Sequence, residues 1–396
     1  MNRPSILLQI NVTANWGSTG KMAEQIGLSA QVHGWESYIA YGRMMNPSKC
    51  HLIKVGNKLD NYIHFAENRL LDNEGLSSRN ATKKLIKVIE KLHPDVIQLH
   101  NIHDHFLNYR LLFEYLNQTD IKVVWAFHDC WAFTGHCYHF VGSDCMRWKD
   151  GCHDCPQRNW FCDQSKRNWN LKKSLFASCP NLTIVPVSQW IGGFVKESFL
   201  KDKRVEVIHN GVDLNVFKPG PPKERGKFDI LAVSNVWPPY KGGADICKLR
   251  EMLPMEDYDI TMVGLSAEQV KSLPSGIKGI QRTQNVQELV NLYSAADVLI
   301  NPTYADTFPT VNIEALACGA PVITYRTGGS PEAVDENTGS VIEQGDIEGL
   351  CAKIQEFKAT GFKQLHSADC RKRAEECFDK DKCFEKYIDL YESLLR

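Results

Sequence analysis

The sequence predicts an α/β protein with two doubly wound parallel sheets. Short β-rich runs alternate with helical patterns along most of the chain, which is typical of repeated βα units. The alternation stops at a Pro/Gly/Lys-rich stretch and then restarts. The length of 396 residues also exceeds the size at which a single hydrophobic core keeps growing. We therefore expect two domains.

The first predicted domain begins with the strand SILLQINV, the turn TANWGSTG and the helix KMAEQIGLSAQVHG. Further strands are predicted at ESYIAYG, DVIQLHN and KVVWAFHD, and helices at TKKLIKVIEKLHP and YRLLFEYLNQT. NLTIVPVSQW and RVEVIHNGVD add two more strand starts. We place this domain at residues 1–218, with a Cys-rich insertion at about 130–165.

The stretch FKPGPPKERGK is the best linker in the sequence. After it the βα pattern returns in FDILAVSN, YDITMVG, VQELVNLYSAADVLINPT, PTVNIEALACG, APVITY and DIEGLCAKIQEF, so a second domain is predicted at 225–376. The terminal run 378–396 has apolar residues at helical spacing and is expected to pack back on the first domain. Two such domains are expected to bind ligands in a cleft between the carboxyl ends of their sheets.

The composition predicts a globular cytoplasmic protein. The chain is 43% hydrophobic and 23% charged, which is ordinary for a globular chain. No apolar run approaches the ~20 residues needed to span a bilayer, and the first residues lack the features of a signal peptide. Residues 1–210 carry 25 Lys/Arg against 19 Asp/Glu, whereas residues 211–396 carry 21 against 28. The basic first half is compatible with an anionic membrane leaflet or with nucleic acid, and an ordinary solvated surface is the alternative. We expect no nucleic-acid partner.

The stretch 306–332, DTFPTVNIEALACGAPVITYRTGGSPE, places single acids beside an apolar helix. The proline ends the extended chain, so the first free N–H groups of the helix are expected at Thr310, Val311 and Asn312. A helix N-terminus that follows a strand in an α/β sheet binds anions, and phosphate is the commonest of them. Glu314 is either a favourable charge for the helix dipole or an acceptor for the vicinal hydroxyls of a ribose.

Three further positions are candidate ligand contacts. Asp306 lies eight residues before Glu314, where it is poorly placed as a helix cap and can reach another part of the same ligand. Gly328 and Gly329 permit close approach of the backbone to a ligand, with a plain turn as the alternative. His128 ends the strand KVVWAFHD, so its ring is expected to face the cleft, with a structural role as the alternative.

Together with HNGVDLNVF and VSNVWPPYKGG, the stretch 306–332 resembles the retaining family 4 glycosyltransferases of GT-B fold. That family carries two acids eight positions apart, a small-residue helix like EALACG, a PV strand and a GG.PE turn, in this order. The resemblance covers nearly the whole chain and is most specific in the second domain. It implies two Rossmann-like domains and a nucleotide-diphosphate sugar as the donor.

The resemblance implies a role for each matching acid. Glu314 corresponds to the acid that binds the nucleotide ribose. Asp306 corresponds to the acid that contacts hydroxyls of the donor sugar, and this acid is usually Glu. A carboxylate one methylene shorter leaves the identity of the donor sugar open.

The resemblance also implies the cations of the site. Lys241 corresponds to the lysine that neutralises the leaving diphosphate, where negative charge builds up during the reaction. Asn235 stands in the place of a family arginine and cannot supply charge. Arg282 and Lys21 are the candidates to replace that arginine. No DxD-type metal site is evident, so no cofactor is expected for catalysis.

In the first domain, NWGSTGKMAEQI resembles the family's glycine loop beside the donor phosphates, and its candidate residues are Gly17, Ser18, Thr19 and Gly20. The loop lacks the GxxxxGK[ST] spacing of a P-loop. His128 corresponds to the family histidine near the donor sugar. It is expected to contact a sugar hydroxyl and not to act as a nucleophile.

The segment DCWAFTGHCYHFVGSDCMRWKDGCHDCPQ concentrates cysteine. Of the 14 cysteines, seven lie between Cys130 and Cys179, which in a reducing compartment indicates metal binding or reduced thiols before disulfides. The spacing C-x7-C-x6-C-x2-C suits tetrahedral zinc, although it matches no standard finger. The candidate structural ligands are Cys137, Cys145, Cys152 and Cys155, with Cys130, Cys162, His136, His139 and His153 as substitutes. Reduced packed cysteines, an iron–sulfur cluster and disulfides are the alternatives.

We therefore expect a retaining glycosyltransferase that moves a sugar to a glycan or lipid-linked acceptor in bacterial capsule, exopolysaccharide or O-antigen assembly. The lysine-rich helix TKKLIKVIEKL suits peripheral contact with the inner face of the cell membrane, and an ordinary surface helix is the alternative. Two other functions fit the sequence. One is a nucleotide-sugar epimerase, and the other is a non-catalytic, zinc-supported binding module on a degenerate transferase fold.

Overall fold

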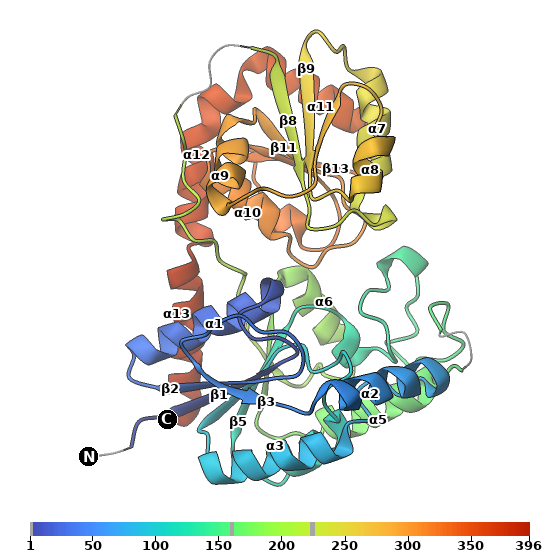
Figure 1. Cartoon of the computed structure of the whole chain (residues 1–396), viewed down its shortest axis with the longest axis vertical. Helices are drawn as coiled ribbons and strands as arrows, with labels where there is room; N and C mark the ends of the chain where they lie inside the picture. The colour runs from blue at the N-terminus through green and yellow to red at the C-terminus, as the bar shows by residue number, and fades with distance from the viewer. Residues whose placement is uncertain (1–2, 159–161, 222–225) are drawn as a thin grey trace. The chain divides into compact units, whose positions relative to one another are not determined.

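The computed structural model, drawn in Figure 1, describes residues 3–158, 162–221 and 226–396. Part of the predicted linker, residues 222–225, lies outside the described residues. The chain divides into two compact units, of which the first comprises residues 1–208 and 384–396 and the second residues 209–383. None of the described helices is both long and apolar enough to cross a membrane.

The first unit contains a seven-stranded parallel sheet in the order β3-β2-β1-β4-β5-β6-β7. Its strands are β1 (Ile6–Asn11), β2 (Glu36–Tyr41), β3 (His51–Lys54), β4 (Val96–Leu99), β5 (Lys122–Phe127), β6 (Leu182–Pro186) and β7 (Arg204–Val205). Every residue of β1, β4 and β6 is buried, as expected for parallel strands that are covered on both faces.

Helices cover both faces of the first sheet. They are α1 (Gly17–Val32), α2 (Lys58–Leu71), α3 (Arg79–Leu92), α4 (Tyr109–Leu116), α5 (Ser165–Phe176) and α6 (Gln189–Glu197), with 3-10 turns at Trp131–Phe133 and Val141–Ser143. In α3, Leu85 and Ile89 are buried whereas the lysines are exposed. The apolar face of this helix is therefore used for packing within the fold.

The last helix of the chain, α13 (Lys380–Leu395), completes the core of the first unit. Its apolar side chains join a cluster with residues of α1, β1, β4, β5 and β6, and Figure 1 shows this helix, in red, beside the blue strands. The buried members from α13 are Phe384, Tyr387, Ile388, Leu390 and Tyr391. The C-terminal helix is therefore part of the first unit, together with the N-terminal residues.

The second unit contains a six-stranded parallel sheet in the order β10-β9-β8-β11-β12-β13. Its strands are β8 (Phe228–Val233), β9 (Tyr258–Val263), β10 (Ile277–Ile280), β11 (Val298–Asn301), β12 (Val322–Tyr325) and β13 (Gly339–Ile342). Its helices are α7 (Gly243–Met252), α8 (Ala267–Ser272), α9 (Val286–Ala295), α10 (Thr310–Ala317), α11 (Ile347–Thr360) and α12 (Phe362–Cys377), with 3-10 turns at Pro239–Lys241 and Ser330–Ala333.

Both sheets reverse their winding beside their first strand. In the first unit β1 lies between β2 and β4, and in the second unit β8 lies between β9 and β11. Open α/β sheets bind ligands at this switch point, outside the carboxyl ends of the strands. The loops that follow β1, β4, β8 and β11 are therefore the places where functional side chains are expected.

Candidate active site

The loops after β8 and β11 bring two predicted site residues into contact. Lys241 ends the 3-10 turn after β8, and Asp306 lies in the loop between β11 and α10. Lys241 Nζ donates a hydrogen bond to Asp306 Oδ2 at 2.6 Å, and the two side chains are only 22% and 19% exposed. A charge-assisted bond of this length fixes the direction of both side chains at the switch point.

Two glycines allow these loops to pack closely. Gly242, at φ +75°, follows Lys241, and a Cβ there would lie 2.0 Å from the carbonyl oxygen of Pro302. Gly328, at φ +55°, would place a Cβ 1.6 Å from the carbonyl oxygen of Asp306. Any side chain at Gly328 would therefore displace the Asp306 backbone.

The helix α10 begins directly after the Asp306 loop. Among the residues that the structure describes, no side chain caps its N-terminus. The backbone N–H of Asn312 donates to the carbonyl of Pro309 at 3.2 Å, so one of the three N–H groups expected to be free already has a partner within the turn. The N–H groups of Thr310 and Val311 form the uncapped end of the helix.

The side chain of Asn312 has a structural partner. It is buried, and its Oδ1 accepts a hydrogen bond from Asn301 Nδ2 at 2.9 Å. This bond ties the first turn of α10 to the end of β11. Because Oδ1 is already hydrogen-bonded, a ligand can contact Asn312 only through its backbone or its Nδ2 group.

Glu314 lies one turn into α10, and a buried tyrosine orients it. Tyr293 of α9 donates its hydroxyl to Glu314 Oε2 at 2.8 Å. Burial, and then the Glu314 carboxylate, raises the pKa of Tyr293 well above its usual range, so the tyrosine remains a proton donor. The contact holds the Glu314 carboxylate in one direction.

The remaining predicted cations and polar groups lie in exposed positions. Asn235 is exposed in the loop after β8, and Arg282 is exposed in the loop after β10. Lys21 is exposed on α1 and belongs to the first unit. That Arg282 or Lys21 supplies the charge of the family arginine stays a prediction.

Two further contacts around these loops were not anticipated from the sequence. His209 Nε2 lies 2.7 Å from Glu332 Oε2, which joins the HNGVD and GGSPE motifs within the second unit. Asp245 is buried and accepts hydrogen bonds from the hydroxyls of Tyr304 at 2.7 Å and Tyr325 at 2.9 Å. These residues are far apart in sequence, and no local pattern pairs them.

A cavity of about 530 Å³ opens elsewhere in the second unit. Its walls come from the first halves of β8, β9 and β10 and the end of α9, and include Asp229, Asp259 and Lys278. None of the predicted site residues lines it. The charged pair Lys241 and Asp306 lies instead in loops at the opposite, carboxyl ends of the strands.

In the first unit, the predicted glycine loop connects β1 to α1. Gly17 starts the helix at φ +66°, and Gly17, Ser18 and Thr19 are at least partly exposed, whereas Gly20 is buried. A Cβ at Gly20 would lie 2.6 Å from Thr13 Oγ1. Gly20 therefore lets the helix pack on the loop, and the other three residues form its accessible part.

His128 follows β5 and is held by a chain of hydrogen bonds. His100 Nε2 lies 3.0 Å from Gln9 Oε1, an acceptor, and His100 Nδ1 lies 3.2 Å from His128 Nε2. His100 Nε2 also lies 3.3 Å from Gln98 Nε2, and His128 keeps Nδ1 as its second ring nitrogen. Burial lowers the pKa of His128 to about 4, so this ring is neutral at pH 7.

His103 and Asp129 form a second polar pair in the same unit. His103 Nε2 lies 2.9 Å from Asp129 Oδ2, and Asp129 Oδ1 accepts from the backbone of Trp131 at 2.9 Å. Although burial acts in the opposite direction, the Asp129 carboxylate raises the pKa of His103. The strand-end positions after β4 and β5 were the only sequence signal for this pair.

Comparison with known proteins identifies the chain. Residues 227–359 match the family described as Glycosyl transferases group 1, and residues 34–216 match Glycosyltransferase Family 4. The chain belongs to the retaining family 4 glycosyltransferases. This glycosyltransferase is 23% identical over 416 residues to an Escherichia coli K12 protein named for colanic acid biosynthesis, the glycosyl transferase WcaC, across 98% of this chain and 100% of WcaC.

Solved structures share the fold of this glycosyltransferase. Sucrose-phosphate synthase from Thermosynechococcus elongatus matches with a TM-score of 0.74 at 17% identity, over 98% of this chain and 99% of that one. HepE from Anabaena, solved with UDP, matches with a TM-score of 0.68 at 13% identity, over 98% and 100%. These structures confirm the predicted GT-B fold, and the family matches confirm the predicted enzyme class.

Proposed function

We propose that this glycosyltransferase moves a sugar from a nucleoside diphosphate to a hydroxyl of a glycan or lipid-linked acceptor in the assembly of a bacterial surface polysaccharide. The ion pair of Lys241 with Asp306, beside the uncapped start of α10, is the observation that carries the proposal. It joins a cation for phosphate and a carboxylate for hydroxyls at one switch point. The likeness to WcaC supports exopolysaccharide assembly as the setting.

In this proposal the second unit binds the donor. Lys241 and the N–H groups at the start of α10 neutralise the diphosphate. Glu314, oriented by Tyr293, accepts hydrogen bonds from the ribose hydroxyls. Asp306 accepts a hydrogen bond from a hydroxyl of the sugar. The HepE structure that contains UDP supports a sugar linked to a nucleoside diphosphate as the donor.

The first unit contributes the remaining groups. The accessible part of the glycine loop, from Gly17 to Thr19, lies beside the donor phosphates in this proposal. The neutral ring of His128 forms a hydrogen bond with a hydroxyl of the sugar through Nδ1. A neutral imidazole has one acceptor nitrogen, so it is better suited to bind a hydroxyl group than to bind an anion.

The reaction proceeds by displacement on one face of the sugar. The acceptor oxygen forms a bond to the anomeric carbon on the face from which the diphosphate leaves, so the configuration is retained. The bond from the anomeric carbon to the phosphate oxygen breaks, and its electron pair stays on the diphosphate. That phosphate oxygen takes the proton of the acceptor hydroxyl, so no enzyme base is needed.

A panel of nucleotide sugars, followed by mass spectrometry, tests the proposal. We expect one donor to yield a free nucleoside diphosphate together with a glycosylated acceptor. Glu314→Ala and Lys241→Ala should each lose this turnover. Conversion of the donor to an isomeric nucleotide sugar would instead indicate an epimerase. Donor binding with no turnover by the unaltered enzyme would indicate a binding module.

We also propose that α2 brings the enzyme to an anionic membrane surface on the cytoplasmic side. Leu59, Tyr62 and Ile63 lie on one face of α2, and Leu59 and Tyr62 are 66% and 72% exposed. His64 of the same helix is hydrogen-bonded to Ser78 at the start of the lysine-rich α3. Exposed apolar side chains next to basic ones suit a headgroup surface.

Flotation with vesicles of phosphatidylcholine and phosphatidylglycerol tests this contact. We expect binding that falls when Leu59 and Tyr62 are both replaced by serine. The matched control is a double replacement on another exposed surface, Val286→Ser with Leu365→Ser, which should leave binding unchanged. Equal flotation of both variants, or no binding by the unaltered protein, would refute the contact.

A further inference from the structure

The segment between β5 and α5 gathers four cysteines around one small cavity. The cavity measures about 10 Å³, which is room for a single water-sized body or ion and not for an organic group. Thr134, Trp148 and His153 also line it. The four cysteines, called the cysteine cluster below, are Cys137, Cys145, Cys152 and Cys155.

One pair of sulfurs has the separation expected of two ligands of the same cation. Cys137 Sγ lies 3.7 Å from Cys155 Sγ. Two sulfurs bound to the same tetrahedral zinc, each about 2.3 Å from it, lie about 3.8 Å apart. Cys152 Sγ accepts a hydrogen bond from the backbone N–H of Gly135 at 3.2 Å, and such donors favour a thiolate over a thiol. The separation of the Cys137 and Cys155 sulfurs is far too long for a disulfide bond, which is about 2.05 Å long.

We propose that the cysteine cluster holds one structural Zn²⁺ ion through four thiolates. Four sulfur ligands that close around an ion, with no position left for substrate, are the pattern of structural zinc sites. Thiolates also select zinc over magnesium or calcium, which prefer oxygen ligands.

The groups that surround the cluster can balance its charge. Zinc with four thiolates carries a net charge of −2, which is costly to bury without nearby cations. Lys172 is buried, and its Nζ donates to the carbonyls of Trp131 at 2.7 Å and Thr134 at 3.1 Å. Lys172 thus places an ammonium group close behind the loop that carries the first cluster cysteine.

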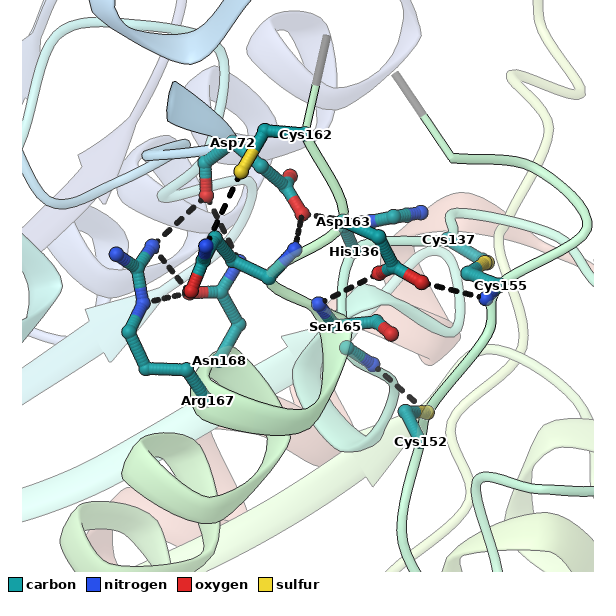
Figure 2. A network of polar contacts seen from close by, with 12 residues as sticks. Asp72, His136, Cys137, Cys152, Cys155, Cys162, Asp163, Ser165, Arg167 and Asn168 are labelled. Atoms are coloured by element: carbon teal, nitrogen blue, oxygen red, sulfur yellow. Dashed lines mark hydrogen bonds and ion pairs between the residues drawn. The ribbon is translucent and has the colours of Figure 1, made fainter. Parts of the chain in front are cut away.

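His136 lies near Cys137 and Cys155, as Figure 2 shows. Its Nδ1 is 3.0 Å from Asp72 Oδ2, and a ring nitrogen lies within 4.8 Å of the sulfurs of Cys137 and Cys155. Asp72 is fully buried, so the imidazole is fixed in place. Because His136 does not line the cavity, whereas all four cysteines do, we assign it as a positioning residue that donates a hydrogen bond to a bound thiolate.

Hydrogen bonds connect the cysteine cluster to the loop that follows the His103–Asp129 pair at the carboxyl ends of β4 and β5. The backbone N–H of Cys155 donates to Asp163 Oδ2 at 2.7 Å, and Asp163 Oδ1 accepts from Ser165 at the start of α5. At the other end of the segment, Cys130 N donates to the carbonyl of Tyr138 at 2.8 Å. Metal binding would therefore fix the loop that directly follows Asp129.

The metal content of the full-length chain, purified without chelator, tests the proposal. We expect one zinc per chain by elemental analysis, and X-ray absorption that reports four sulfur ligands at about 2.3 Å. Cys145→Ser should lose the zinc. The matched control is Cys162→Ser, because Cys162 lies in the same segment but accepts from Gln164 Nε2 outside the cavity. This control should retain one zinc.

His136→Asn separates a positioning residue from a ligand. We expect this variant to keep one zinc per chain and to release it to a chelator about tenfold faster, as for other hydrogen-bond partners of metal ligands. If Cys145→Ser does not fold, release of zinc from the unaltered protein by an organomercurial thiol reagent provides the same information. An absence of stoichiometric zinc, or coordination by three sulfurs and one imidazole, would overturn the four-thiolate site. None of these measurements depends on donor or acceptor activity.

Discussion

The ammonium of Lys241 lies 2.6 Å from the carboxylate of Asp306, although the two residues are 65 positions apart. The loops after β8 and β11 bring them together beside the start of α10. Each side chain therefore restrains the other before any ligand is bound. A substitution at either position acts on both, and this coupling shapes the first two predictions.

Lys241→Ala should lower kcat by roughly 10²- to 10³-fold, the usual loss when one group that stabilises developing charge is removed. Steady-state measurement of diphosphate release checks the effect. The control is Lys248→Ala, which removes an exposed lysine from α7 in the same unit. Equal rates in the two variants would remove Lys241 from the mechanism.

Asp306→Glu should change the preference between donor sugars. The longer side chain can still pair with Lys241, but its carboxylate reaches one methylene further toward the sugar. We expect the ratio of kcat/KM for two competing donors to change by about tenfold, the range known for a one-methylene change in a binding pocket. Asp259→Glu, at an exposed position of β9, is the control. An unaltered donor ranking would show that Asp306 does not select the sugar.

Tyr293→Phe should weaken donor binding more than turnover. The substitution removes the hydroxyl that orients Glu314 and leaves the ring in place. Loss of one hydrogen bond to a charged group is worth about 1.5 to 3 kcal/mol, so we expect KM for the donor to rise at least about tenfold with little change in kcat. Tyr115→Phe, in the first unit, is the control. A fall in kcat with unchanged KM would contradict the positioning role.

His64 should make the protein sensitive to acid. Its Nε2 accepts from the backbone of Gly75 at 2.9 Å and its Nδ1 lies 2.8 Å from Ser78 Oγ, so the ring is held neutral. Burial, and then the His105 ring, lowers the pKa of His64 to about 3, against about 6.5 in an unfolded chain. Between these values only the unfolded chain takes up the proton.

The free energy of unfolding should therefore fall as the pH drops from about 6.5 toward 3, by up to about 1.4 kcal/mol per pH unit from this residue. Denaturant unfolding at a series of pH values measures the slope. His64→Gln keeps an acceptor for Gly75 and cannot titrate, so its slope should be shallower. His93→Gln, at an exposed position, should keep the slope of the unaltered protein. Parallel curves for all three proteins would contradict the prediction.

Ile388→Ala should destabilise the first unit. Ile388 is almost completely buried between α13 and the sheet, and truncation of such a side chain costs about 2 to 5 kcal/mol. Leu395→Ala, at the 41% exposed end of the same helix, should cost far less. Chemical denaturation monitored by tryptophan fluorescence compares the two. A similar loss in both variants would mean that α13 is not an integral part of this core.

The βα repeats made the fold predictable, because buried parallel strands are continuous apolar runs and amphipathic helices alternate with them. The site residues Lys241, Asp306 and Glu314 were selected by their place in a family pattern. Their partners could not be read in the same way. Tyr293 looks like an ordinary core residue of a helix, and its contact with Glu314 depends on how α9 packs beside α10.

The contacts of the polar groups in the first unit could not be predicted from the sequence either. His128 was chosen because it ends a strand, but His100 and His103 follow a different strand and become its neighbours only when β4 and β5 pair. The spacing of the cysteine cluster suggested a metal site. The contact of His136 with Asp72 needed the fold, because these residues are 64 positions apart.

The placement of α13 has a consequence for synthesis on the ribosome. The first unit lacks five buried side chains of its core until the final helix emerges, after the whole of the second unit has been made. Until then the nascent first unit has an uncovered apolar face over β1, β4 and β5. Such exposed apolar surface favours association with chaperones. A chain that ends before Phe384 would lack all five side chains, and that face would stay exposed.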